Sequence, residues 1–227
     1  MIPRCIVIVP DGNRRWAEMN HRTVFAGYEQ GLLNCRRVVR AAFEQGVQHV
    51  VFWAASELNL QRRPAHELVF LFKLLKRELR SRIQNPEETG FHLCGAWERL
   101  ARDKELADLV RTAHQKAARY NDQQLTVLFG YSGKTELLEA FRELAVGGEI
   151  VTEGAVRSHL WTSHLPDVDL LIRTGVHGDP HWSDSLLPWQ MINTHLHFSS
   201  KFWPDFTAED LSEVLRGFGQ RPRRMGA

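Results

Sequence analysis

The residues with the clearest chemistry stand near the N-terminus, in Asp-Gly-Asn-Arg-Arg at positions 11–15. They follow the apolar run 5–9, and a helical pattern begins near Arg14. Backbone N–H groups at a helix start, together with two guanidinium groups, can bind a phosphate or a diphosphate. Asp11 would repel that anion unless a hard cation such as Mg2+ lay between them. The alternative is an ordinary strand–helix corner in which Asp11 or Asn13 caps the helix, and the segment alone does not decide.

Three further polar segments also follow apolar, strand-like runs. They are "SELNLQRR" (56–63), "GYSGKTE" (130–136) and "RTG" (173–175). The second has the glycine and lysine of a nucleotide-binding P-loop, but the earlier glycine of that pattern is replaced by Leu128. We therefore exclude nucleotide hydrolysis at this turn. Taken singly, each of the three segments is also explained as a solvated turn.

The loop that follows Arg173 is dense in side chains that can ligate a metal ion. Its histidines, aspartates and serine are His177, Asp179, His181, Ser183 and Asp184. Their spacing matches no known zinc motif, so a zinc site is not indicated. A solvated loop around one structural arginine is the alternative to a binding role.

Short β-rich runs alternate with longer helical patterns along the chain. The expected strands are 5–9, 49–55, 91–95, 125–131, 169–175 and 192–198, and the expected helices are 31–46, 64–83, 104–121 and 133–145. This alternation predicts a single α/β domain over 1–227, with a mostly parallel sheet of about six strands flanked by helices. Ligands of such sheets bind beyond the carboxyl ends of the strands, where the polar segments stand.

Composition narrows the class of protein. The chain has 227 residues and a formal net charge of +2, which argues against a protein that wraps nucleic acid. Three widely spaced cysteines form neither a disulfide framework nor a metal motif, and no apolar stretch approaches the length of a membrane span. We expect a cytoplasmic protein without a secretory signal.

Taken together and in order, these segments resemble the cis-prenyltransferases, the undecaprenyl diphosphate synthase family. The most specific match is "DGNRRWA" (11–17). It is supported by "GYEQG" (27–31), "LNLQRRP" (58–64), "GYSGKTEL" (130–137), "DLLIRTG" (169–175) and "FWPDF" (202–206). The resemblance implies the family's fold, with an apolar tunnel for the isoprenoid tail. We expect its depth to depend on how Trp53, Ala54, Phe70 and the helix at 64–83 pack. It also implies a homodimer with weak association to a membrane surface.

The resemblance assigns roles residue by residue. Asp11 matches the aspartate that holds Mg2+ on a diphosphate, Asn59 the asparagine that assists proton loss, and Arg62 the arginine beside it. The expected grip on the allylic diphosphate consists of Gly12, Asn13, Arg14 and Arg15, with Arg22 as a substitute for a missing family arginine. Arg173 matches an arginine that binds the diphosphate of isopentenyl diphosphate.

The departures from the family pattern concentrate on the second substrate. Val24 and Tyr28 replace an arginine and a histidine, and Leu58 takes a glutamate position, with Glu57 displaced by one residue. Further on, the best alignment places His181 on the second arginine and Ser183 on the serine beside it, while His195 replaces a metal-site glutamate. A histidine lacks the bidentate fork of arginine and is mostly neutral near pH 7.

These departures favour a divergent enzyme acting on allylic prenyl diphosphates with Mg2+. The expected reaction is short-chain condensation with isopentenyl diphosphate, or irregular coupling to a second allylic diphosphate, rather than undecaprenyl synthesis. One alternative is a terpene-synthase-like ionisation followed by cyclisation or hydrolysis. A second alternative is a non-catalytic subunit that binds prenyl lipids. That alternative is disfavoured because such subunits are expected to lose the segment 11–15, which this chain keeps.

Overall fold

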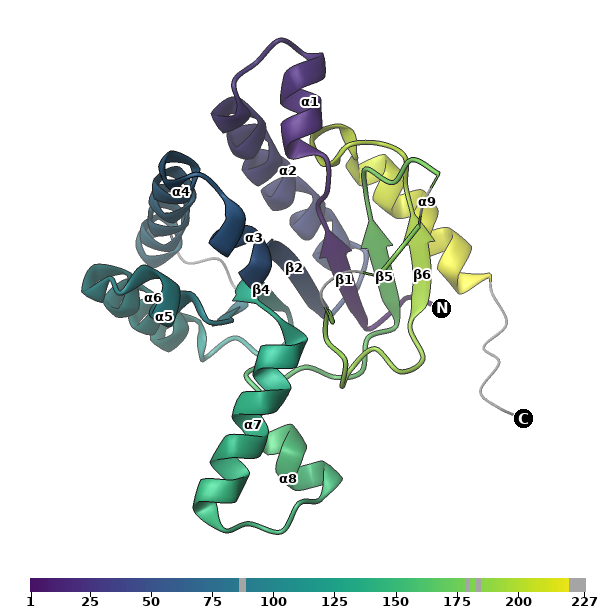
Figure 1. Ribbon diagram of the computed structural model, residues 1–227. Coiled ribbons are helices and arrows are strands. Elements are labelled where there is room, and N and C mark those ends of the chain that lie inside the picture. The colour runs from purple at the N-terminus through teal and green to yellow at the C-terminus, as the bar shows by residue number, and fades with distance from the viewer. Residues whose placement is uncertain (86–88, 179, 183–184, 221–227) are drawn as a thin grey trace.

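A six-stranded parallel sheet forms the centre of the protein (Figure 1). The computed structural model describes residues 1–85, 89–178, 180–182 and 185–220. The strands are β1 (Cys5–Val9), β2 (His49–Ser56), β3 (Gly90–Cys94), β4 (Gln124–Tyr131), β5 (Leu170–Arg173) and β6 (His195–Phe198). Their spatial order is β3-β4-β2-β1-β5-β6, and every neighbouring pair is parallel. The predicted sheet is confirmed.

Helices and helical turns connect the strands. They are α1 (Asn13–Met19), α2 (Val24–Glu44), α3 (Glu57–Arg62), α4 (Ala65–Gln84), α5 (Trp97–Ala101), α6 (Lys104–Ala117), α7 (Gly133–Gly147), α8 (Glu153–Ser158), η1 (Trp203–Asp205) and α9 (Ala208–Gly219). One face of the sheet packs against apolar side chains of α2, α4, α6 and α9, and the other is covered by apolar residues of the segments 161–168 and 186–191. None of these helices, within the described ranges, is long and apolar enough to cross a membrane.

β1 is the central strand, and all five of its residues are buried. It pairs with β2 on one side and β5 on the other, with Ile8 opposite Phe52 and Val9 opposite Arg173. β2, β3 and β4 lie on one side of β1, and β5 and β6 lie on the other. The strand order therefore reverses at β1, and sheets of this kind bind ligands at the carboxyl end of such a switch point. Asp11 follows β1 directly.

α2 begins seven residues earlier than the expected helix 31–46, because Gly27 and Gly31 lie inside it rather than at its start. A Cβ atom at Gly27 would stand 2.4 Å from the carbonyl oxygen of Asn13, and one at Gly31 would stand 2.2 Å from Asn13 Oδ1. The two glycines therefore mark a close packing of α1 on α2 rather than a break in the helix. Thr23 caps the new start by accepting a hydrogen bond from the Ala26 N–H at 3.2 Å.

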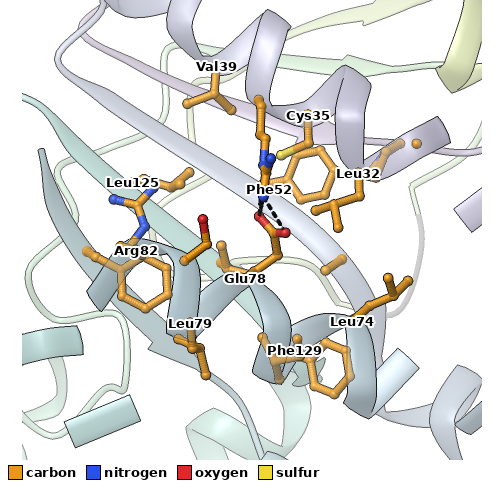
Figure 2. A pocket seen from close by; sticks show the side chains of 18 of the residues that line it. Leu32, Cys35, Val39, Phe52, Leu74, Glu78, Leu79, Arg82, Leu125 and Phe129 are labelled. Carbon is orange, nitrogen blue, oxygen red and sulfur yellow. Dashed lines mark hydrogen bonds and ion pairs between the residues drawn. The ribbon is translucent and has the colours of Figure 1, made fainter. Parts of the chain in front are cut away.

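A cavity of about 570 Å³ lies between α2, α4 and the sheet, and its position agrees with the expected tunnel (Figure 2). Pro10, Asn13 and Tyr28 line the end nearest the carboxyl edge of the sheet. Of the three residues expected to set the depth, Ala54 lines the cavity. Trp53 is buried on the opposite face of the sheet, and Phe70 packs on Phe25 and Tyr28 without lining the cavity.

Candidate active site

The carboxylate of Asp11 stands between two guanidinium groups. Arg15 Nη2 donates to Asp11 Oδ1 at 3.0 Å, and Arg173 Nη2 donates to Asp11 Oδ2 at 3.1 Å. The Asp11 side chain is 40% exposed, whereas that of Arg173 is 10% exposed. A carboxylate and two arginines, held at the open edge of the sheet, form a site that can receive an anion together with a cation.

The backbone at Asp11 is fixed by the C-terminal part of the chain. Its carbonyl oxygen accepts from Thr174 Oγ1 at 2.8 Å and from the Trp203 N–H at 3.0 Å. Gly12 has a φ of 109°, and a Cβ atom there would lie 2.6 Å from the Phe202 ring. Only glycine fits that turn. The alternative in which Asp11 or Asn13 caps the helix is wrong, because Gly12 is the N-cap residue of α1 and no side chain caps the helix start.

The Phe202 ring packs against Arg15 of the same site. The Arg15 guanidinium lies 5.1 Å from the centre of its ring, and His177 packs edge-on against it at 5.3 Å. The segment "FWPDF" therefore places a cation–π contact beside Arg15. Trp203 and Phe206 of the same segment are fully buried.

Arg14 and Arg15 point to different partners. Arg14 Nη2 lies 3.9 Å from Glu67 Oε1, in a cluster that the sequence analysis did not identify. Glu67 is buried and accepts a hydrogen bond from the Tyr28 hydroxyl at 2.5 Å. Arg63 donates to the Tyr28 hydroxyl, lies over its ring, and pairs with Glu67 at 3.5 Å. Burial and the bond to Glu67 raise the pKa of Tyr28, so its hydroxyl stays protonated.

Tyr28 thus fills the position of the family's histidine with a neutral donor. It lines the mouth of the cavity, so this cluster joins the charged edge to the apolar space. The expected arginine at 62 is exposed on α3, while the neighbouring Arg63 has only 18% of its side chain exposed and belongs to the cluster. Arg63 rather than Arg62 contacts Tyr28 because residues 57–62 form the helical turn α3, where a loop was expected.

Asn59, Arg22 and Asn13 were also expected at the site of the allylic diphosphate. Asn59 is exposed on α3, which follows β2 at the carboxyl edge. Arg22 is exposed beyond the far end of α1. Asn13 donates from Nδ2 to the Pro10 carbonyl at 3.2 Å and lines the cavity mouth. Its Oδ1 is buried and accepts no hydrogen bond from the described residues. The structure therefore brings Asp11, Asn13 and Arg15 together but leaves Arg22 apart.

On the side expected for the second substrate, the main chain of the loop meets Arg173. Arg173 Nη1 donates to the His181 carbonyl at 2.9 Å. The His181 backbone therefore lies beside Arg173, while His181 and Trp182 are exposed. Ser183 lies outside the described residues. Glu57, the displaced glutamate, is held by Arg99 at 3.0 Å and Thr135 at 2.6 Å, away from Asp11.

His195 does not join Asp11 within this chain. It is the first residue of β6 and pairs with Leu170, so it stands at the amino end of the sheet. Its ring packs edge-on against Phe218 at 5.3 Å. The run "THLHF" indicates a strand but not which end of it faces the site, and parallel register places Phe198, not His195, beside Arg173.

The residues present fit a magnesium ion that is shared with a substrate. No group of three or more metal-ligating side chains occurs in the part of the chain that the structure describes. Mg2+ needs no such cage, because it is commonly held by one carboxylate, water and the phosphates of a ligand. Asp11, partly exposed between two arginines that attract phosphate, offers that single carboxylate.

Comparisons with known proteins identify the family of the chain. A family model described as "Putative undecaprenyl diphosphate synthase" matches residues 9–226. An isoprenyl transferase of Ralstonia nicotianae is 32% identical over 229 residues, covering 99% of this chain and 87% of that protein.

Two solved structures are also similar. Lavandulyl diphosphate synthase from Lavandula x intermedia, in complex with dimethylallyl diphosphate, superposes with a TM-score of 0.90 at 28% identity, covering 100% of this chain and 99% of the other. A probable undecaprenyl diphosphate synthase from Campylobacter jejuni, at 21% identity with 99% of each chain covered and a TM-score of 0.79, shares the fold. The chain belongs to the undecaprenyl diphosphate synthase family of prenyltransferases.

Proposed function

We propose that this prenyltransferase transfers the prenyl group of a short allylic diphosphate, with Mg2+ as cofactor. The single observation that carries the proposal is the Asp11 carboxylate between Arg15 and Arg173, beside the mouth of an apolar cavity. The oxygens of a diphosphate bound there would replace the Asp11 carboxylate as the hydrogen-bond partners of the two guanidinium groups. Its hydrocarbon tail would enter the cavity past Asn13 and Tyr28.

The charged residues of the site would bind the metal ion and the diphosphate. Asp11 would hold Mg2+, which supplies charge stabilisation to the leaving diphosphate when bound. Arg15, resting on Phe202, and Arg173 would bind the phosphate oxygens and stabilise the charge that grows as the allylic C–O bond breaks. Asn59 and Arg62 stay as proposed catalytic residues on α3, and Arg63 joins them because it borders the cavity mouth through Tyr28.

The acceptor is proposed to be a second short substrate. On that side Tyr28, held by Glu67 and Arg63, stands where the family pattern has a histidine, and His181, whose backbone contacts Arg173, stands where it has an arginine. The likeness to a lavandulyl diphosphate synthase bound to dimethylallyl diphosphate supports a five-carbon allylic substrate. The proposed reaction is therefore irregular coupling of two allylic diphosphates or a short condensation with isopentenyl diphosphate.

The active form is proposed to be a homodimer. β6 is an edge strand of the sheet, and Ile192 and Leu196 beside its open edge are 72% and 44% exposed. An unpaired edge with apolar side chains is favourable for pairing with a second chain. Analytical ultracentrifugation should give twice the chain mass, and a single-chain mass at micromolar concentration would contradict the dimer.

Product analysis tests the proposal. Purified protein is incubated with dimethylallyl, geranyl or farnesyl diphosphate, with and without isopentenyl diphosphate and with Mg2+ or EDTA, and the products are identified by mass spectrometry. We expect products of 10 to about 15 carbons that require Mg2+ and are absent for Asp11→Ala. A hydrocarbon or alcohol of unchanged carbon number would indicate ionisation of a single substrate instead. A polyprenyl ladder would indicate long-chain synthesis.

A further inference from the structure

The lining of the cavity changes character along its length. At the mouth stand Asn13 and Tyr28, and the next stretch is apolar, formed by side chains that include Leu32, Cys35, Leu71, Leu74 and Phe129. Beyond that stretch the lining is mixed: apolar side chains such as Val39, Phe43 and Leu125 continue, but most of the cavity's polar side chains lie here. Its polar members there are Arg36, Arg40, Glu44, Glu78, Ser81, Arg82, Asn85, Thr89 and Gln123. Apart from the two residues at the mouth, no polar lining residue precedes Arg36 and Glu78 along α2 and α4.

Arg36 of α2 and Glu78 of α4 form a bridge between the two helices that wall the cavity (Figure 2). Arg36 Nε donates to Glu78 Oε2 at 2.9 Å, and its Nη2 donates to Oε1 at 2.5 Å and to Oε2 at 2.8 Å. This is the bidentate geometry in which a guanidinium and a carboxylate fix one another's position. The dashed lines in Figure 2 cross the space between the apolar residues of the two helices.

The region beyond the bridge is occupied by its own polar contacts. Arg82 donates to Thr89 Oγ1 at 3.1 Å and lies over the Phe91 ring at 4.9 Å. Gln123 donates to the Phe43 carbonyl at 3.4 Å. A hydrocarbon tail that entered this region would cover charged and amide groups, which is unfavourable unless they keep their partners.

We infer that the Arg36–Glu78 ion pair is the floor of the prenyl-binding chamber and limits the tail to two or three isoprene units. This inference rests on the proposed function, since it assumes that an allylic diphosphate places its tail in the cavity. The bridge acts through desolvation more than through its own strength, because partly exposed ion pairs are themselves weak. A longer tail must part the two charged groups and bury them against hydrocarbon.

Helix geometry sets the length. Arg36 follows Tyr28 by eight residues on α2, which is about 12 Å along the helix axis. An isoprene unit adds four chain bonds, or roughly 4.5 Å, by comparison with the extended span of about 3.5 Å for the three backbone bonds of a residue. The apolar stretch between mouth and bridge therefore accommodates tails of 10 to about 15 carbons.

The test measures binding rather than turnover. Thiolodiphosphate analogues of dimethylallyl, geranyl, farnesyl and geranylgeranyl diphosphate resist ionisation, and their affinities are measured by calorimetry with Mg2+. For the natural chain we expect affinity to rise with length up to farnesyl and to drop roughly tenfold for geranylgeranyl, in line with the affinity carried by a few buried methylene groups. In Arg36→Leu/Glu78→Leu the drop disappears, and the geranylgeranyl analogue gains roughly tenfold or more.

A matched pair of residues controls for general loosening of the helices. Glu29 and Arg77 also join α2 to α4, at 3.2 Å, but neither lines the cavity. Glu29→Leu/Arg77→Leu should keep the natural length dependence. Glu78→Gln keeps the shape of the side chain but removes its charge, and it should relieve part of the drop in affinity for the geranylgeranyl analogue. It replaces the double variant if that variant does not fold.

The results distinguish a failure of the inferred floor from a failure of the proposed function. Binding without a drop at geranylgeranyl, or the same profile in natural and leucine-substituted proteins, overturns the floor and leaves the proposed function intact. Failure of every analogue to bind overturns both.

Discussion

Two strand-to-helix turns at the carboxyl end of the same sheet each carry a glycine and a carboxylate but lie in opposite environments. Asp11 follows β1 in a glycine-bearing turn and is 40% exposed, with each carboxylate oxygen on an arginine. Glu136 follows β4 after another glycine-bearing turn and is 1% exposed. Its oxygens accept from Tyr131 and from the Thr162 backbone and hydroxyl groups. The first carboxylate can exchange partners with a ligand, while the second is closed within the protein.

The electrostatics of the closed edge agree with this difference. Burial raises the pKa of Glu136, although hydrogen bonds from Tyr131 and Thr162 act in the opposite direction. Burial also raises the pKa of Tyr131 well above its ordinary value. Gln190 extends the network by donating to Thr162 Oγ1 at 2.8 Å. We infer that "GYSGKTE" stabilises the fold at β4 and that binding chemistry belongs to the β1–β5 edge.

The largest expected effect is at the open carboxylate. Asp11→Ala should lower kcat/KM by on the order of a hundredfold to a thousandfold, because it removes the only proposed protein ligand of the cation. The melting temperature should change little, since the Asp11 side chain is partly exposed. Steady-state kinetics and thermal melts measure the two effects. Asp11→Asn is the isosteric control, and activity within twofold of the natural protein in either variant would contradict the assignment.

The closed carboxylate should show the reverse behaviour. Glu136→Ala should lower the free energy of unfolding by about 3 kcal/mol, because it leaves Tyr131 and Thr162 without their buried partner. Urea unfolding followed by circular dichroism measures the change. The matched variant Glu136→Gln keeps an acceptor and should lose less than half as much. Loss of activity in folded Glu136→Gln without loss of stability would place Glu136 in the site instead.

A smaller effect is expected at Arg173, which touches both the carboxylate and the His181 carbonyl. Arg173→Lys keeps the charge but loses the planar fork, so KM for the allylic diphosphate should rise roughly tenfold. Titration of the allylic diphosphate at saturating acceptor separates this KM from that of the acceptor. Arg37→Lys, at an exposed position, is the control and should leave both values unchanged.

The smallest effect concerns acid stability on the closed side. His92 stacks on His164 at 3.7 Å, His114 lies beside His92, and burial lowers the pKa of all three, that of His164 to about 3. The unfolded chain binds these protons near pH 6.5, so stability is full above pH 6.5 and falls as the pH drops toward 3. We expect a loss on the order of 1 kcal/mol per pH unit in that window.

Urea unfolding at a series of pH values measures this slope. His164→Asn should flatten it, whereas His66→Asn, at an exposed position, should not. The raised pKa of Glu136 acts in the opposite sense, because folding favours its protonated form, so Glu136→Gln should steepen the slope. Equal slopes in the natural protein and His164→Asn would refute the histidine contribution.

The sequence predicted the sheet well because the signals are local. Buried parallel strands are continuous apolar runs, and a polar turn after each run marks the carboxyl end. β1 and its turn therefore could be identified from residues 5–15 alone. The pairing of Asp11 with Arg173 needed only the rule that such ends share one edge.

The missed features depend on contacts between distant residues. Glu67 lies inside an amphipathic helix, and nothing in its local sequence shows that Tyr28, 39 residues earlier, donates to it. Arg36 and Glu78 likewise meet across 42 residues. The error at His195 has a different cause, because a strand pattern gives no direction relative to the site until the register with β5 is known.

One backbone contact has a consequence for how the enzyme is made. The Asp11 carbonyl is held by Thr174 and Trp203, about 160 and 190 residues later in the chain. On the ribosome the N-terminal residues emerge first, before Thr174 and Trp203 are available. The turn at Asp11 is therefore among the first segments synthesised and among the last to reach its final geometry. A nascent chain that ends before Trp203 would carry every residue of the diphosphate grip and still lack the site.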